Sequence, residues 1–208
     1  MKKIFKIVII LMVVISILIS LYTIKLGYDY YKNNEDSIKI EKFYIEQEKI
    51  VNKQEEQSEE LDNNNTNNYS KENYVAVIKI PKIGLERGIY EQSSRLNTVD
   101  KNIQILKESD YPNINNGNFI LAAHSGVGKI AYFKNLYKLD LNDEVKIIYN
   151  GKEYSYKVVN KYEVDKTGHI EILRNMNVST LTLTTCKHNT DKQIVVICEL
   201  EQEVDFER

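Results

Sequence analysis

The longest apolar run of the chain lies near its N-terminus. Ile7 to Ile24 form an uncharged stretch of 18 residues, which follows three lysines among the first six positions. As a helix rising about 1.5 Å per residue, this stretch measures roughly 27 Å, close to the roughly 30 Å of a membrane's hydrocarbon core. The core of a signal peptide is usually only about 7–15 residues long and ends at a small-residue cleavage site, which Leu21–Leu26 does not offer. The pattern predicts an uncleaved, single-pass membrane anchor within residues 1–28, with the N-terminus in the cytoplasm and the rest of the chain outside the cell.

Polar residues dominate positions 29–72, where Glu and Lys give way to a run of asparagines. A partial helical stripe of apolar residues runs through the first half of this zone and comprises Ile40, Phe43, Tyr44, Ile50 and Val51. The composition predicts a polar, charged stalk or linker that is partly helical, because few apolar residues are available for burial. A coiled-coil element that joins two copies of the chain is the alternative.

From residue 73 onwards, apolar and polar residues alternate in short runs, as they do in half-buried strands. These runs lie at residues 75–80, 83–85, 88–90, 118–124, 144–149, 153–164, 180–186 and 193–200. Asn150–Gly151 separates two of them and is a strong hairpin signal, because both turn positions need positive φ. Short helices are expected near 97–107 and 130–139, and 170–176 is expected to be a brief helix or a loop. About eight short strands with little helix predict a mainly β domain over 73–208, folded as a closed or nearly closed barrel.

Charge and cysteine content narrow the function classes. The formal net charge of −2 provides no electrostatic argument for binding nucleic acid. Two cysteines are too few for a disulfide scaffold. Cys198 lies inside the apolar run Ile194–Cys198 and is interpreted as a small core residue, although the sequence leaves a Cys186–Cys198 disulfide open. A zinc site built from Cys186, His188 and Cys198 would have the wrong spacing and too few ligands, so we expect no metal and no cofactor.

Cys186 ends an alternating run, just before a polar break in the chain. Because strand side chains alternate between faces, Leu183 can enter a core while Thr184 and Cys186 share the opposite face. His124 lies at the end of an earlier predicted strand, and only the fold can bring it to the thiol. A lone cysteine with a distant histidine is a candidate nucleophile and base. His188 is the alternative base, whereas His169 is interpreted as a surface loop residue.

Four segments, in their order and spacing behind the predicted anchor, resemble the sortases, the membrane-anchored cysteine transpeptidases of Gram-positive bacteria. They are Ile78–Gly84, the strand leading to His124, Phe133–Leu136 and Thr182–Cys186. The resemblance covers residues 74 to about 200 together with the anchor. It implies the eight-stranded β-barrel of that family and an extracellular catalytic domain held at the cell membrane.

The resemblance also implies roles for individual residues. Cys186 would attack the Thr–Gly carbonyl of an LPXTG-like C-terminal sorting signal on a secreted protein and hold it as a thioester. His124 would act as the general acid and base. An amine of a cell-wall peptide, or a pilin lysine, would then resolve the thioester. Thr185 and Lys192 are expected to contact the substrate.

The chain departs from the family pattern at one position. Sortases carry an arginine on the strand after the cysteine, and Gln193 occupies that place here. Losing such a donor typically costs about 3 kcal/mol of transition-state stabilisation. Gln193 could serve as a weaker donor, or Lys192, Lys187, Arg87 or Arg95 could substitute for it. The remaining alternative is a slow or inactive homologue that acts as an anchored module binding sorting signals.

Overall fold

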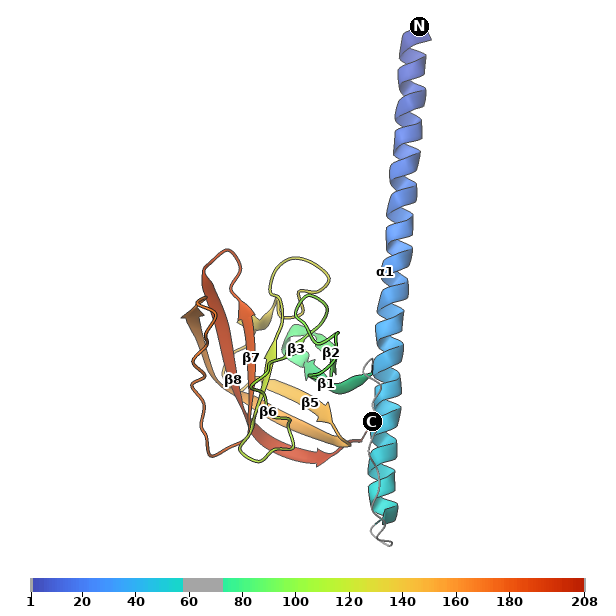
Figure 1. Cartoon of the computed structure of the whole chain (residues 1–208). Helices are drawn as coiled ribbons and strands as arrows, with labels where there is room; N and C mark the ends of the chain where they lie inside the picture. The colour runs from blue at the N-terminus through green and yellow to red at the C-terminus, as the bar shows by residue number, and fades with distance from the viewer. Residues whose placement is uncertain (1, 58–72, 208) are drawn as a thin grey trace. The chain divides into compact units, whose positions relative to one another are not determined.

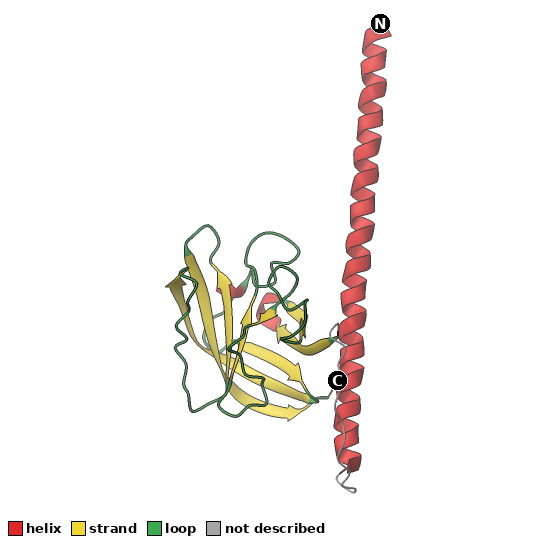
Figure 2. Ribbon diagram, in the orientation of Figure 1, coloured by secondary structure: helices red, strands yellow, loops and turns green. Residues whose placement is uncertain are grey.

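The computed structural model describes residues 2–57 and 73–207 of the 208-residue chain, as one long helix and a β-barrel (Figure 1; Figure 2). The helix α1 runs from Lys2 to Gln57, and two 3₁₀ turns, η1 (Pro81–Ile83) and η2 (Leu136–Lys138), interrupt the strands. The strands are β1 (Tyr74–Ile80), β2 (Leu85–Tyr90), β3 (Gln104–Ile105), β4 (Asn118–Ala122), β5 (Glu144–Tyr149), β6 (Lys152–Asp165), β7 (Thr180–Cys186) and β8 (Lys192–Asp205). The chain divides into two compact units, Met1–Lys39 and Ile40–Arg208.

The first unit is helical throughout its described part. Its apolar side chains, such as Met12 and Leu18, are exposed along the helix. Among the described residues this is one helix long and apolar enough to cross a membrane, judged by length and composition. That property agrees with the anchor expected between Ile7 and Ile24.

The second unit contains one eight-stranded sheet in the order β2-β1-β5-β6-β8-β7-β4-β3. The pairs are antiparallel except for β4 and β7, which run parallel. The two edge strands, β2 and β3, contact each other, and the side chain of Asn102, two residues before β3, donates to the Gly88 carbonyl of β2 (2.7 Å) and accepts from Arg87 Nε (2.8 Å). The predicted mainly β, nearly closed eight-stranded barrel is therefore confirmed.

Side-chain alternation decides which face of each strand enters the barrel. On β7 and β8 the inward positions, including Leu183, Val196 and Cys198, belong to the main apolar core. Both cysteines are free, so the Cys186–Cys198 disulfide that the sequence left open is absent. The predicted hairpin is present between β5 and β6, where Asn150 and Gly151 have φ of 51° and 77°.

The structure places a boundary inside the segment interpreted as a stalk. Residues 40–57 of α1 belong to the same compact unit as the barrel. The apolar stripe of this segment packs on the barrel, since Phe43 and Tyr44 join an aromatic cluster with Phe206. Gln47 is fully buried and its Oε1 accepts a hydrogen bond from the Gly151 amide (2.6 Å). The rest of the predicted linker, from residue 58 to residue 72, lies outside the described residues.

The predicted short helices form only in part. No helix occurs at 97–107, where the chain makes turns around β3. The side chain of Asn97 pairs with both backbone groups of Ile105 (2.7 and 3.0 Å), and such bonds compete with a helix. The helix expected near 130–139 is reduced to η2, and 170–176 is a loop.

Candidate active site

The parallel pairing of β4 and β7 sets the position of the predicted nucleophile and base. Ala122 pairs with Thr184, so both strands end at the same edge of the sheet. Beyond the strands, the Ala123 amide still donates to the Thr184 carbonyl (3.3 Å), and the Ser125 hydroxyl donates to the Cys186 carbonyl. His124 therefore leaves β4 beside the point where Cys186 ends β7, and both residues are partly exposed.

A carboxylate holds the imidazole of His124. Nε2 lies 3.0 Å from Oδ1 of Asp100, which comes from the turns between β2 and β3. Because an ionised carboxylate only accepts hydrogen bonds, this contact requires the proton on Nε2, and Nδ1 is the ring nitrogen left to exchange a proton with another group. The His124 carbonyl also accepts from the Phe133 amide (3.0 Å), which fixes the backbone. Sequence reasoning did not find Asp100, because it lies in an irregular segment with no periodic pattern.

Gln193 lies directly across the β7–β8 pairing from Cys186. Side chains opposite each other in an antiparallel pair share one face and are about 5 Å apart at Cβ. The Oε1 atom of Gln193 is buried and has no hydrogen-bond partner within the described part of the chain. The amide therefore lies next to the thiol and has an unused acceptor oxygen.

Two of the cations considered as substitutes for an arginine, Arg87 and Lys187, have other partners. Arg87 is buried, stacks over the Tyr132 ring (4.6 Å) and donates to Asn102. Lys187 donates to Glu163 (2.6 Å). Lys192, the first residue of β8, directly precedes Gln193 and is exposed.

Arg95 and Thr185, two further residues singled out from the sequence, have different settings in the structure. Arg95 lies in the segment that carries Asp100 and lines neither cavity described below. The Thr185 hydroxyl is buried and donates to the Ala123 carbonyl (2.6 Å). That bond connects β7 to the residue preceding His124, so Thr185 braces the two strand ends.

A cavity of about 450 Å³ opens at the end of the barrel beside Cys186, and we call it the mouth cavity. It is lined by Ser125, Phe133, Lys134, Tyr137, Lys161, Tyr162, Glu163, Thr185, Cys186, Lys187, His188 and Ile194. Its buried lining is mostly apolar, and its charged lining consists of three lysines and one glutamate. His188 is thus near the thiol, but its side chain is on an exposed loop, whereas that of His124 is held by Asp100.

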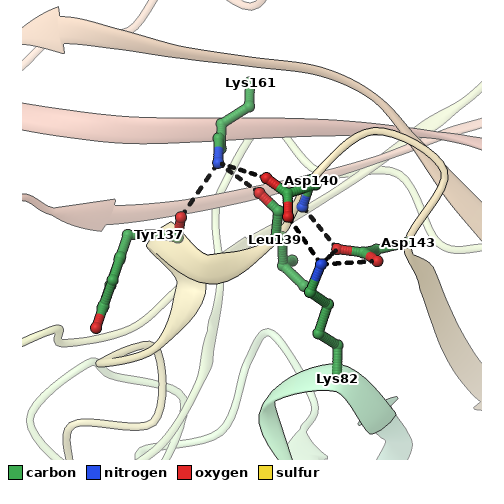
Figure 3. Close-up of polar contacts among 6 residues, drawn as sticks. All are labelled: Lys82, Tyr137, Leu139, Asp140, Asp143 and Lys161. Carbon is green, nitrogen blue, oxygen red and sulfur yellow. Dashed lines mark hydrogen bonds and ion pairs between the residues drawn. The ribbon is translucent and has the colours of Figure 1, made fainter.

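The wall of the mouth cavity is braced by a polar network (Figure 3). Lys161 Nζ donates to the carbonyls of Tyr137 (3.1 Å) and Leu139 (2.5 Å). Lys82 Nζ, from η1, contacts the carboxylates of Asp140 (2.8 Å) and Asp143 (2.9 Å). The hydrogen bond from Lys82 lowers the pKa of Asp140 and raises that of Lys82. The segment that follows η2 is therefore tied to two other parts of the barrel.

A second cavity of about 440 Å³ lies on the outer face of β4 and β7, and we call it the outer groove. It is lined by Leu106, Glu108, Ile120, Gly168, His169, Ile170, Ile172, Thr182 and Thr184. Thr182 and Thr184 share the strand face of Cys186, so the outer groove leads along β7 towards the thiol. His169, interpreted from the sequence as a surface residue, is part of this lining.

The second cysteine has the opposite setting. Cys198 is fully buried among core residues, and burial raises the pKa of its thiol far above the ordinary value. A thiol held neutral in an apolar interior is unreactive. Cys186 is therefore the cysteine that can react.

Comparison with known proteins assigns the chain to a family. The family model described as the sortase domain matches residues 78–201. The chain belongs to the sortase family. It is 28% identical over 110 residues to Sortase D of Bacillus subtilis (strain 168), an alignment that covers 53% of this chain and 52% of that relative. This sortase thus spans about half the length of the curated relative that it matches.

Solved sortase structures have the same fold. A Clostridium perfringens Sortase D5 transpeptidase is 25% identical, with a TM-score of 0.54, and the match covers 73% of this chain and 89% of that chain. Sortase A of Listeria monocytogenes is 20% identical with a TM-score of 0.55, covering 65% and 92% of the two chains. The barrel is therefore a sortase barrel.

Proposed function

We propose that this sortase is a cysteine transpeptidase that cleaves an LPXTG-like sorting signal through a thioester on Cys186. The convergence of His124 and Cys186 at one edge of the parallel β4–β7 pair supports this proposal. A thiolate is a good nucleophile, and its thioester stays reactive towards amines.

The reaction has two acyl transfers. The Cys186 sulfur attacks the carbonyl carbon of the Thr–Gly bond, and His124 gives a proton to the departing amine as the C–N bond breaks. An incoming amine then attacks the same carbon and gives a proton to His124. The C–S bond breaks, the thiolate returns, and the substrate is joined to the acceptor through a new amide bond.

Asp100 and Gln193 assist the reaction in different ways. Asp100, 3.0 Å from Nε2 of His124, acts as a positioning residue that keeps Nδ1 available for proton transfer. Gln193 lies beside Cys186 and provides amide N–H groups for the oxyanion that develops on the attacked carbonyl. A neutral amide stabilises this charge less than a guanidinium does, so we expect slow chemistry.

The outer groove is the place for the sorting signal. Its lining includes apolar side chains such as Ile120, Ile170 and Ile172, which suit the Leu-Pro part of the signal. A peptide lying there along β7 would reach Cys186 with its C-terminal end. The helix within Met1–Lys39 would anchor the enzyme in the cell membrane with the barrel outside, where it would meet secreted proteins and amines of the cell wall or pilins.

A cleavage assay tests the proposal. The full chain in detergent micelles is incubated with a panel of LPXTG-like peptides, and intact mass spectrometry follows the acyl adduct. We expect an adduct on the wild type that hydroxylamine removes, and none on the Cys186→Ala variant. Absence of turnover and adduct across the panel, together with measurable peptide binding, would favour the alternative of a module that only binds sorting signals.

A further inference from the structure

We propose that Asn150–Gly151, the turn between β5 and β6, is a latent deamidation site, and that residues 40–57 of α1 keep it unreactive. In an Asn-Gly sequence the backbone nitrogen of the glycine can attack the side-chain amide of the asparagine. The turn lies where α1 packs on the barrel. The proposal therefore does not depend on the chemistry of Cys186.

The reaction converts a side-chain amide into a carboxylate. The Gly151 nitrogen bonds to Cγ of Asn150, the C–N bond of the side-chain amide breaks, and the proton from the Gly151 nitrogen leaves with the ammonia. The product is a cyclic succinimide. Water then opens the ring at either carbonyl, which gives aspartate or isoaspartate at position 150. A glycine favours the attack because it has no side chain to obstruct it.

Both backbone groups of Gly151 are held in hydrogen bonds. The N–H donates to Oε1 of Gln47 (2.6 Å), and the carbonyl accepts from the Phe206 amide (2.8 Å). Gln47 is fully buried, so water does not compete for the first of these bonds. An N–H that donates a hydrogen bond resists the loss of its proton. A nitrogen fixed in this way must first be released by a local opening before it can reach the asparagine side chain.

The helix also packs closely against this turn. A Cβ atom added at Gly151 would lie 3.0 Å from Cγ2 of Ile50 and 3.5 Å from Cγ2 of Val51. The position thus requires glycine for space as well as for its φ of 77°. Asn150 is exposed, whereas Gly151 is buried. Solvent can therefore reach the asparagine side chain while the attacking nitrogen stays covered.

The chain contains a second Asn-Gly pair, Asn116–Gly117, which provides an internal comparison. Asn116 is exposed and Gly117 is buried, as in the first pair. The Gly117 amide donates to the Ile114 carbonyl (3.0 Å). This acceptor belongs to the barrel, whereas the acceptor for the Gly151 amide belongs to α1. Release of residues 40–57 would therefore expose the first pair and leave the second unchanged.

Peptide mapping of aged protein tests the proposal. The full chain in detergent micelles is incubated in mildly alkaline buffer, and tryptic digestion with mass spectrometry measures aspartate and isoaspartate at residues 116 and 150. A synthetic peptide of residues 147–152 is incubated in parallel. We expect residue 150 of the wild type to convert at least about tenfold more slowly than the peptide, because a local opening must precede the attack. Equal rates would overturn the proposal, and this comparison needs no variant.

Gln47→Met provides the variant, because methionine keeps the approximate length of the side chain and removes the acceptor. Glu46→Met is the matched control, since Glu46 is exposed at the neighbouring position of the helix. We expect Gln47→Met to raise the conversion at residue 150 by about tenfold, the effect of losing one buried hydrogen bond, with no change at residue 116. Glu46→Met should leave both rates as in the wild type. An unchanged rate at residue 150 in Gln47→Met, or an equal rise at both residues, would overturn the proposal.

Discussion

The two ends of the long β6–β8 ribbon are built for different tasks. At one end, where Lys152 pairs with Asp205, aromatic residues of α1 and the C-terminal segment cover the barrel. At the other end, where Asp165 pairs with Lys192, the barrel opens into the mouth cavity beside Cys186. At the first end the aromatic cluster is buried although the last residues of β8 are exposed, whereas the open end carries lysines and a partly exposed thiol.

This contrast shows where stability and chemistry reside. Burial of large aromatic side chains contributes most of the stabilisation available to a small barrel. The open end cannot be covered in the same way, because its charged groups would lose water without gaining enough partners. The stabilising aromatic cluster and the reactive thiol therefore lie in different parts of the barrel.

The thiols provide the strongest test of this division. Cys186→Ala should lower turnover by about 10³-fold or more with little change in Tm, because the nucleophile is lost. Cys198→Ala should retain turnover and lose about 1–2 kcal/mol of stability through a small core cavity. Peptide cleavage and urea unfolding measure the two effects. Comparable loss of turnover in both variants would contradict the separation.

The covered end should respond in the opposite sense. Phe43→Ala removes a buried ring from the aromatic cluster, and we expect a loss of about 3 kcal/mol in the free energy of unfolding. Turnover below the unfolding transition should change little. Ile45→Ala is the control, because Ile45 lies on the same helix segment and is 39% exposed. Urea unfolding that shows equal stability for the two variants would mean that the helix does not cover the barrel.

Asp100 tests how the open end is organised. Asp100→Ala should reduce kcat by about tenfold and leave KM nearly unchanged, because the imidazole loses the group that orients it. Asp100→Asn keeps an acceptor oxygen for Nε2 and should recover most of this loss. The carboxylate is mostly exposed and the imidazole is partly exposed, so we expect little change in Tm. An Asn variant as poor as the Ala variant would show that acceptor geometry is not what Asp100 supplies.

Gln193→Arg tests whether the amide beside Cys186 occupies the donor position. If the amide occupies the donor position of the family arginine, the substitution should preserve kcat/KM or raise it by up to about tenfold. Gln193→Leu is the control, because it keeps the approximate size and removes the donor. A large loss in the arginine variant would mean that β8 does not align with the family pattern as proposed.

The smallest effect is expected for the network beside η2. Lys82→Met should lower the urea midpoint slightly at neutral pH, because surface ion pairs contribute little. The lowered pKa of Asp140 means that this contribution is present above about pH 4, the ordinary range of an unfolded carboxyl, and fades as the pH falls further. Urea midpoints of both proteins over acidic pH values should therefore converge. A difference that grows towards low pH would contradict the assigned pairing.

Many strands of the barrel could be predicted from the local pattern of apolar and polar residues. Five of the predicted runs became strands with similar bounds, the run at 193–200 became the longer β8, and the Asn150–Gly151 turn has the positive φ values it requires. The alternation around Cys186 also assigned the faces of β7 correctly, with Leu183 inside and Thr184 outside. The docking of residues 40–57 was missed, because a partial stripe does not reveal which surface will bury it. Asp100 was missed because no periodicity relates it to His124.

By itself, the sequence determined the strands, the membrane-length helix and the two candidate reactive residues, since hydrophobic periodicity and turn chemistry act over neighbouring positions. Only the tertiary structure decided that β4 and β7 run parallel, which brings His124 and Cys186 to the same edge. An antiparallel arrangement would have put them at opposite ends of the pair. Strand direction depends on the whole path of the chain around the barrel, so no local pattern specifies it.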